Sequence, residues 1–195
     1  MSFVRSCGLL VVLAFVLVSI SCGGEPPDSE MQQAQGALDA ARAAGAERYA
    51  AEEFLAAVDA LKRAHAAAAD RDYRLALNNA LDSRDRAKNA TRMAADGKAA
   101  ARVDADHALT AAADALADAQ ATAKAAESLR PSANALGAVR TAISHAETRL
   151  QEARSAFDKG DYMVAAAQAK AVTSDLTVAT SDLERAIPGS ARRRR

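Results

Sequence analysis

The sequence contains little of what a β-rich or nucleic-acid-binding protein needs. Among its 195 residues, aromatic side chains make up only 4%, tryptophan is absent, and there are nine glycines and four prolines. Strands favour β-branched and aromatic residues separated by frequent turn residues, so this composition argues against all-β and α/β folds. Basic and acidic residues are equal in number, 25 of each, whereas nucleic-acid-binding domains show a basic excess. We therefore expect no nucleic-acid partner.

Residues that carry catalytic or metal chemistry are also scarce. The three histidines, His65, His107 and His145, lie far apart, and none belongs to a metal-binding motif. Acidic and basic residues alternate at helical spacing, as in Asp59 with Arg63, and such pairs mark a solvated helix face. No glycine-rich phosphate loop is present. The sequence therefore predicts a protein that is not an enzyme and uses no metal and no cofactor.

The N-terminus has the layout of a secretory signal peptide. Residues 1–21 contain one basic residue, Arg5, then an apolar run from Leu9 to Val18, and then small and apolar residues before Cys22. The alternative is a retained membrane-spanning anchor. An apolar run of about ten residues is short of the roughly 20 that cross a bilayer. We therefore predict a signal peptide over residues 1–21.

The residues from Val18 to Gly24, Val-Ser-Ile-Ser-Cys-Gly-Gly, resemble the lipobox of bacterial lipoproteins. This resemblance implies that Cys22 is lipidated and becomes the mature N-terminus, while Cys7 is lost with the signal peptide. Ser19 departs from the pattern, which usually has Leu, Val or Ile there, and ordinary secretion with cleavage near Cys22 is the alternative. Gly23 after the cysteine implies export to the outer membrane. We therefore expect a chain anchored by lipid to the outer membrane and facing the periplasm.

Alanine is the most abundant residue, with 54 copies in the chain. It is the strongest helix former, whereas glycine and proline are the strongest breakers. Residues 22–29 contain two adjacent prolines and no apolar periodicity, which indicates a lipidated cysteine followed by a flexible tether. Residues 30–187 contain one proline, Pro131. This region is predicted to be all-α, an elongated antiparallel bundle of coiled-coil hairpins.

The clearest hairpin is predicted over residues 132–187. Its apolar residues alternate in steps of three and four, which places them on the seam of a helix pair. Between its two helices lies Lys159-Gly160-Asp161, where Gly160 suits a helix C-terminus and Asp161 a new N-terminus. The predicted seam residues are Leu136, Val139, Ile143, Ala146, Leu150, Ala153 and Phe157 on the first helix, and Tyr162, Ala165, Ala169, Val172, Leu176, Ala179, Leu183 and Ala186 on the second.

An earlier hairpin, over about residues 46–96, repeats this plan. A shift of 89 residues places Asp72 on Asp161 and Tyr73 on Tyr162, together with several apolar positions of both helices. The alternative is that two alanine-rich helices align through composition alone. A short amphipathic helix from Met31 precedes the first hairpin. A separate connecting helix is predicted over residues 98–130, because Gly97 favours a kink or break.

Two further features are candidate interaction sites. Tyr73 and Tyr162 occupy matching places and could expose their hydroxyls, although rings that pack under a helix turn are the structural alternative. The chain ends in a basic tail over residues 188–195, with four arginines at 192–195. When these four arginines and Arg5 are left out, the rest of the chain has 25 − 5 = 20 basic and 25 acidic residues, so it carries a net negative charge. The candidate anion- or membrane-binding residues of the tail are Arg192, Arg193, Arg194 and Arg195, and a solvated disordered end is the alternative.

The segment 37–53, together with 60–64 and Asp72-Tyr73, resembles a family of bacterial envelope lipoproteins with an alanine-rich helical domain of unknown function. Members of this family often carry an OmpA-like peptidoglycan-binding domain. No such domain follows here, and Ala51 replaces the usual proline. The resemblance implies a helical envelope lipoprotein and supplies no catalytic residues.

These observations predict a non-enzymatic, lipid-anchored cell-envelope protein that acts as a structural scaffold or adaptor. Its expected partners are the membrane, through the N-terminal lipid, and an envelope protein or wall polymer. The alternative is a peptide-binding module in the periplasm, because the segment 157–165 looks somewhat like the Gly-x-Tyr-x-x-Ala segment of a tetratricopeptide repeat. That repeat has a period of about 34 residues, which the 89-residue shift does not match.

Overall fold

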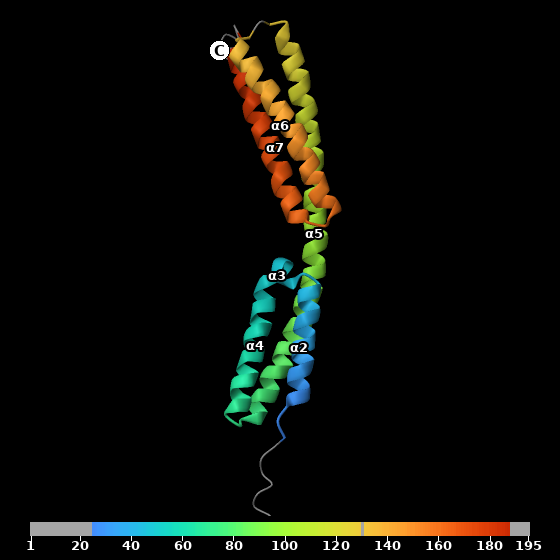
Figure 1. Ribbon diagram of the computed structural model, residues 1–195, viewed down its shortest axis with the longest axis vertical. Helices are drawn as coiled ribbons and strands as arrows, with labels where there is room; N and C mark the ends of the chain where they lie inside the picture. The colour runs from blue at the N-terminus through green and yellow to red at the C-terminus, as the bar shows by residue number, and fades with distance from the viewer. Residues whose placement is uncertain (1–24, 130, 188–195) are drawn as a thin grey trace, which may run out of the picture. The chain divides into compact units, whose positions relative to one another are not determined.

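The computed structural model describes residues 25–129 and 131–187, and within these ranges all regular secondary structure is helical. The predicted all-α class with long antiparallel helices is therefore confirmed. The helices are α2 (Asp28–Ala43), α3 (Ala46–Tyr49), α4 (Ala51–Ala69), α5 (Tyr73–Glu127), α6 (Ala133–Asp158) and α7 (Tyr162–Ala186) (Figure 1).

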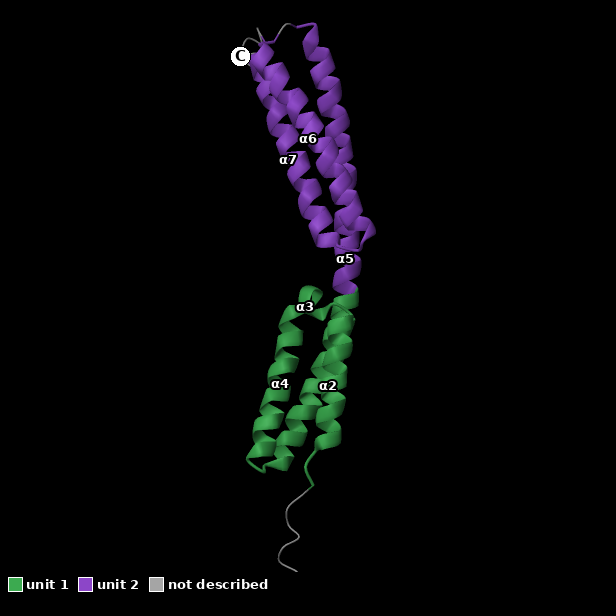
Figure 2. Ribbon diagram, in the orientation of Figure 1, with its two compact units in different colours: residues 1–95 green, residues 96–195 purple. Residues whose placement is uncertain are grey.

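The chain divides into two compact units at the boundary between Ala95 and Asp96 (Figure 2). In unit 1, the buried residues come from α2, α3, α4 and the first part of α5. In unit 2, they come from the second part of α5 and from α6 and α7. The same helix, α5, is thus the last long helix of unit 1 and the first of unit 2.

Of the kink or break predicted near Gly97, the break is wrong. α5 runs through this residue as one helix of 55 residues, so the region predicted as a separate connecting helix over 98–130 belongs to α5, which ends at Glu127. Glycine in a helix interior costs only about 1 kcal/mol relative to alanine. Alanines at positions 94, 95, 99 and 100 flank Gly97, and their helix propensity offsets this cost.

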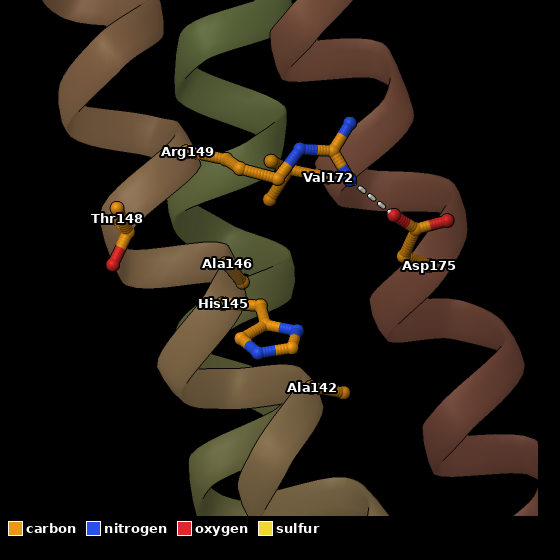
Figure 3. A pocket seen from close by; sticks show the side chains of 7 residues that line it. All are labelled: Ala142, His145, Ala146, Thr148, Arg149, Val172 and Asp175. Carbon is orange, nitrogen blue, oxygen red and sulfur yellow. Dashed lines mark hydrogen bonds and ion pairs between the residues drawn. The ribbon is translucent and has the colours of Figure 1, made fainter.

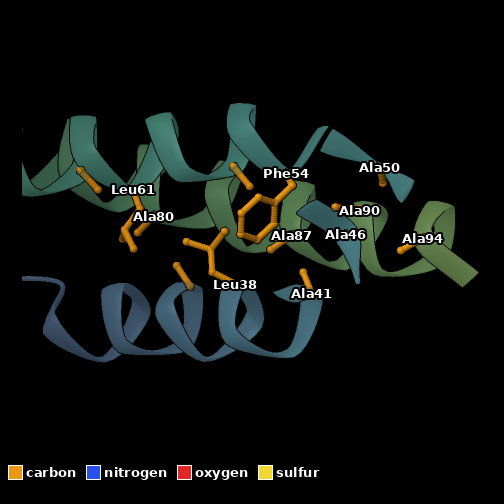
Figure 4. Packing of buried hydrophobic residues seen from close by; sticks show 13 residues of the cluster. Leu38, Ala41, Ala46, Ala50, Phe54, Leu61, Ala80, Ala87, Ala90 and Ala94 are labelled. Atoms are coloured by element: carbon orange, nitrogen blue, oxygen red, sulfur yellow. The ribbon is translucent and has the colours of Figure 1, made fainter. Parts of the chain in front are cut away.

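The core of unit 1 forms where α2, α4 and α5 meet. The ring of Phe54 on α4 and the side chain of Leu38 on α2 point toward one another beside Ala87 of α5 (Figure 4). Phe54 and Leu38 are 4% and 3% exposed, and most of their buried neighbours are alanines. The short amphipathic helix predicted from Met31 corresponds to α2. This helix begins at Asp28, so it includes two residues that were predicted to belong to the tether.

The core of unit 2 follows the predicted seams of α6 and α7. Along α7, Ala165, Ala169, Val172, Leu176 and Leu183 are all buried, with exposures of 1% or less. On α6 the residues at 139, 146, 150 and 153 are buried, whereas those at 136, 143 and 157 are half-buried. The long second hairpin is therefore confirmed, and the buried residues of its two helices are five alanines and five valines or leucines.

The turns that join α4 to α5 and α6 to α7 have the same backbone hydrogen bonds, displaced by 89 residues. The amide of Asp72 donates to the carbonyl of Ala67 at 2.9 Å, and the amide of Asp161 donates to the carbonyl of Ala156 at 2.9 Å. These bonds close a helix end in the way of a Schellman motif. The match supports the interpretation of the two hairpins as a repeat, because composition alone does not fix a turn geometry.

Asp72 also caps α5, at the position that matches Asp161 under the 89-residue shift. Its Oδ1 accepts a hydrogen bond from the amide of Leu75 at 3.0 Å, which satisfies one of the free amides of the first turn. The start of α6 is capped in the same way by Ser132, whose Oγ accepts from the amide of Ala135 at 3.3 Å.

The two turns differ in the residue that adopts a left-handed conformation. Gly160 has φ +83°, and the matching residue in the first turn is Arg71 with φ +61°. A residue other than glycine loses roughly 1–2 kcal/mol of stability in this region. A glycine avoids this strain, but part of the gain is lost because glycine is more flexible in the unfolded chain. We expect Arg71→Gly to raise the free energy of unfolding by about 0.5–1 kcal/mol and Gly160→Ala to lower it by about 1 kcal/mol.

Chemical denaturation of the two variants measures this difference. No side chain lies within 4 Å of a Cβ built on Gly160, so the effect there comes from the backbone alone. Gly137→Ala serves as the control, because Gly137 lies inside α6 with equally open surroundings and should gain about 1 kcal/mol as an ordinary helix position. A loss of stability in Arg71→Gly would contradict the assigned turn.

Candidate functional site

A cleft of about 410 Å³ lies between α6 and α7 (Figure 3). Its volume falls within the range of roughly 300–1,000 Å³ that is usual for small-molecule sites, which in helical bundles often form between neighbouring helices. The cleft is lined by Ala142, His145, Ala146, Thr148, Arg149, Val172 and Asp175. We refer to this set as the α6–α7 cleft.

The floor of the α6–α7 cleft is apolar and is formed by small side chains. Ala146 on α6 and Val172 on α7 are buried, with exposures of 4% and 1%, and both belong to the core cluster of unit 2. Ala142 adds a half-buried methyl group one helical turn before Ala146. The cleft exists because an alanine at position 142 does not reach α7.

Polar groups stand at the rim of the cleft. The Nη1 of Arg149 lies 2.5 Å from the Oδ2 of Asp175 and joins α6 to α7 (Figure 3). Both side chains remain partly in solvent, 40% and 62% exposed, so this ion pair orients the guanidinium more than it stabilises the fold. The imidazole of His145 projects from the preceding turn of α6 beside the same opening (Figure 3).

The sequence placed His145 in no metal-binding motif and did not identify the cleft. His145 is exposed, but it shares a helix face with Arg149, four residues on. That spacing is the signal in the sequence that points to a common site. Asp175 could not be paired with Arg149 without the register of the two helices.

The two tyrosines predicted as candidate interaction residues occupy equivalent positions but have different surroundings. Each is the first residue of a helix after a turn, and each is half-buried. The ring of Tyr162 packs edge-on against Phe157, with 5.2 Å between ring centroids and 63° between ring planes. Tyr73 instead lines a hollow with Leu77 and the segment 25–30. The packed ring of Tyr162 corresponds to the structural alternative.

Five other predicted site residues lie outside the residues that the structure describes. They are the lipidation candidate Cys22 and the tail arginines Arg192, Arg193, Arg194 and Arg195. Their predicted roles stay predictions.

A charged cluster around Arg42 joins the end of α2 to α3 and α4. The guanidinium hydrogen-bonds to Glu47 at 2.9 Å and to Asp39 at 3.0 Å, and its Cζ lies 5.5 Å from the ring centroid of Phe54. The hydrogen bond with Glu47 is the main cause that raises the pKa of Arg42 above its ordinary value. Arginine is charged at any ordinary pH, so the raised pKa only moves the loss of this charge further into the alkaline range. Its contacts connect α2 with α3 and α4 in unit 1.

Within the described part of the chain, no group of three or more His, Cys, Asp or Glu side chains could hold a metal ion. Nor does any helix in residues 25–129 and 131–187 combine the length and the apolarity that crossing a bilayer requires. Comparison of the chain with models of protein families, with characterised proteins and with solved structures gave no match.

Proposed function

We propose that this protein is a non-enzymatic lipoprotein of a bacterial cell envelope, held by a lipid on Cys22, whose helical units serve as a scaffold or adaptor. The observation that carries the proposal is the sequence of the N-terminus. An apolar run of about ten residues ends shortly before Ser21-Cys22-Gly23, the arrangement that lipidation needs. Several acyl chains at one cysteine give stable anchoring, because each buried methylene contributes about 0.8 kcal/mol.

The helical units support the scaffold role through their surfaces. Their long helices carry ion pairs that remain exposed, such as Lys170 with Asp104 and Arg140 with Glu127. Exposed pairs of this kind contribute little to stability, but they keep the helix faces hydrated and open to polar partners. An envelope protein or a wall polymer is the partner that we propose.

The alternative, a tetratricopeptide-like peptide-binding module, is less well supported. Such a repeat fits both of its helices and their turns into about 34 residues. In this chain α6 has 26 residues and α7 has 25, so their hairpin is considerably longer than one such repeat. The α6–α7 cleft is also a local hollow whose lining spans residues 142–149 on α6 and 172–175 on α7.

Processing of the precursor in cells tests the lipid anchor. We expect globomycin, which blocks the lipoprotein signal peptidase, to cause the unprocessed chain to accumulate, and radioactive palmitate to label the wild-type protein. Mature protein without palmitate would contradict the anchor.

Cross-linking in the envelope followed by mass spectrometry, with the full chain and a chain lacking residues 192–195, then tests the tail. An identical set of partners would exclude a role for the four arginines.

A further inference from the structure

The α6–α7 cleft has a counterpart in unit 1, because the two hairpins are related by a shift of 89 residues. The turns and most of the buried positions of the two hairpins match under this shift. The repeat therefore provides an internal comparison for the cleft. Each cleft residue has a counterpart in unit 1, and three of these counterparts are polar residues that link the helices there: Glu53 at the position of Ala142, Ser83 at that of Val172, and Arg86 at that of Asp175.

In unit 1 these residues connect α4 and α5 directly. The Oγ of Ser83 donates to the carbonyl of Ala57 at 2.8 Å, and this serine is fully buried. The Nη1 of Arg86 lies 3.6 Å from the Oε2 of Glu53. The Nδ2 of Asn89 donates to the Oε1 of the same glutamate at 3.2 Å. Glu53 therefore reaches across the groove between the two helices.

In unit 2 this bridge is missing. Ala142 has no carboxylate, and the ion pair between the helices is formed instead by Arg149, two turns further along α6, with Asp175. His145 and Arg149 stand where unit 1 has Ala56 and Ala60. The second hairpin thus lacks the side chain that spans the groove in the first and has an imidazole and a guanidinium at its edge.

We propose that the α6–α7 cleft binds a small organic acid with a compact apolar body. The carboxylate would accept hydrogen bonds from Arg149 and His145, and the apolar body would pack against Ala142, Ala146 and Val172. The guanidinium is permanently charged and has five N–H donors. Asp175 accepts one hydrogen bond, from Nη1, which leaves other donors for a ligand and holds the group at the rim.

The charge and the shape of the cleft both favour this class of ligand. Charge-assisted hydrogen bonds from arginine to carboxylate are among the strongest that proteins make with small molecules. An apolar floor with a few polar groups at the edge is the usual composition of a small-molecule site. This proposal is independent of the lipid anchor, because it depends only on the described residues of unit 2.

Titration of the full-length chain with 4-tert-butylbenzoate tests the proposal, with the neutral 4-tert-butylbenzamide as the matched probe. Methyl NMR signals of Ala142, Ala146 and Val172 report on the floor of the cleft. We expect the acid to shift these signals with a dissociation constant of about 1 mM, as is usual for a ligand of this size. The amide should bind at least about tenfold more weakly, because it lacks the charge-assisted bond.

Three variants make the test specific. Arg149→Gln should weaken binding of the acid at least about tenfold, and Ala142→Phe should abolish it by filling the cleft. Arg140→Gln is the control, because Arg140 is on the same helix but pairs with Glu127 outside the cleft, so affinity should be unchanged. Arg149 is partly exposed, so its variant should retain the circular dichroism spectrum of the wild type.

Several results would overturn the proposal. The absence of binding, equal affinity for the acid and the amide, or methyl shifts confined to residues outside the cleft would each do so. Unchanged affinity in a folded Ala142→Phe variant would show that the acid binds elsewhere. None of these results would bear on lipidation at Cys22.

Discussion

Leu176→Ala is expected to lower the free energy of unfolding by about 3–4 kcal/mol. Leu176 is fully buried in unit 2 and is one of the few large side chains among the alanines of its core. Removal of its isobutyl group leaves a cavity between helices whose other contacts are mostly methyl groups, which cannot move in to fill the space. Urea denaturation followed by circular dichroism at 222 nm measures the loss.

Val178→Ala is the matched control for this prediction. Val178 lies two residues away on the same helix, but this residue is 57% exposed. Its truncation should therefore change the stability by less than about 0.5 kcal/mol. Equal effects of the two substitutions would contradict the assignment of the inner face of α7.

Ala169→Leu is expected to destabilise unit 2 by about 2–3 kcal/mol, although leucine is more hydrophobic than alanine. Ala169 is fully buried on the seam of α7. A larger side chain there must push neighbouring helices apart or adopt a strained rotamer. Thermal and chemical denaturation would both report the change.

Ala167→Leu separates crowding from the effect of leucine on helix propensity. Ala167 is exposed on the opposite face of α7, and leucine is nearly as good a helix former as alanine. This variant should be close to the wild type in stability. If Ala169→Leu were neutral or stabilising as well, alanine at the seam would not reflect close approach of the helices.

The sequence predicted the helical hairpins because periodicity and turn chemistry agree over long segments. The seam of α7, the turn at Gly160 and the cap at Asp72 each follow from a residue type at the position where it is needed. The two hairpins also share an aspartate and a tyrosine after the turn, and this shared pair indicates the repeat from the sequence alone.

Two features could not be predicted in the same way. The continuity of α5 depends on the sum of helix propensities over many residues, in which Gly97 is one small unfavourable contribution. The α6–α7 cleft depends on the register between two helices, which brings Arg149 to Asp175 and leaves Ala142 in the lining of the cleft. The position of His145 in the sequence indicates neither the ion pair nor the cleft.

The lipid anchor is tested by the mass of the mature N-terminal peptide, determined by mass spectrometry on protein purified from bacterial membranes. We expect a peptide that begins at Cys22 and carries a diacylglyceryl group, and we expect Cys22→Ser to abolish both the modification and the cleavage. A mature chain that begins at any other residue, or one whose Cys22 carries no lipid, would contradict the proposal of a lipid-anchored scaffold.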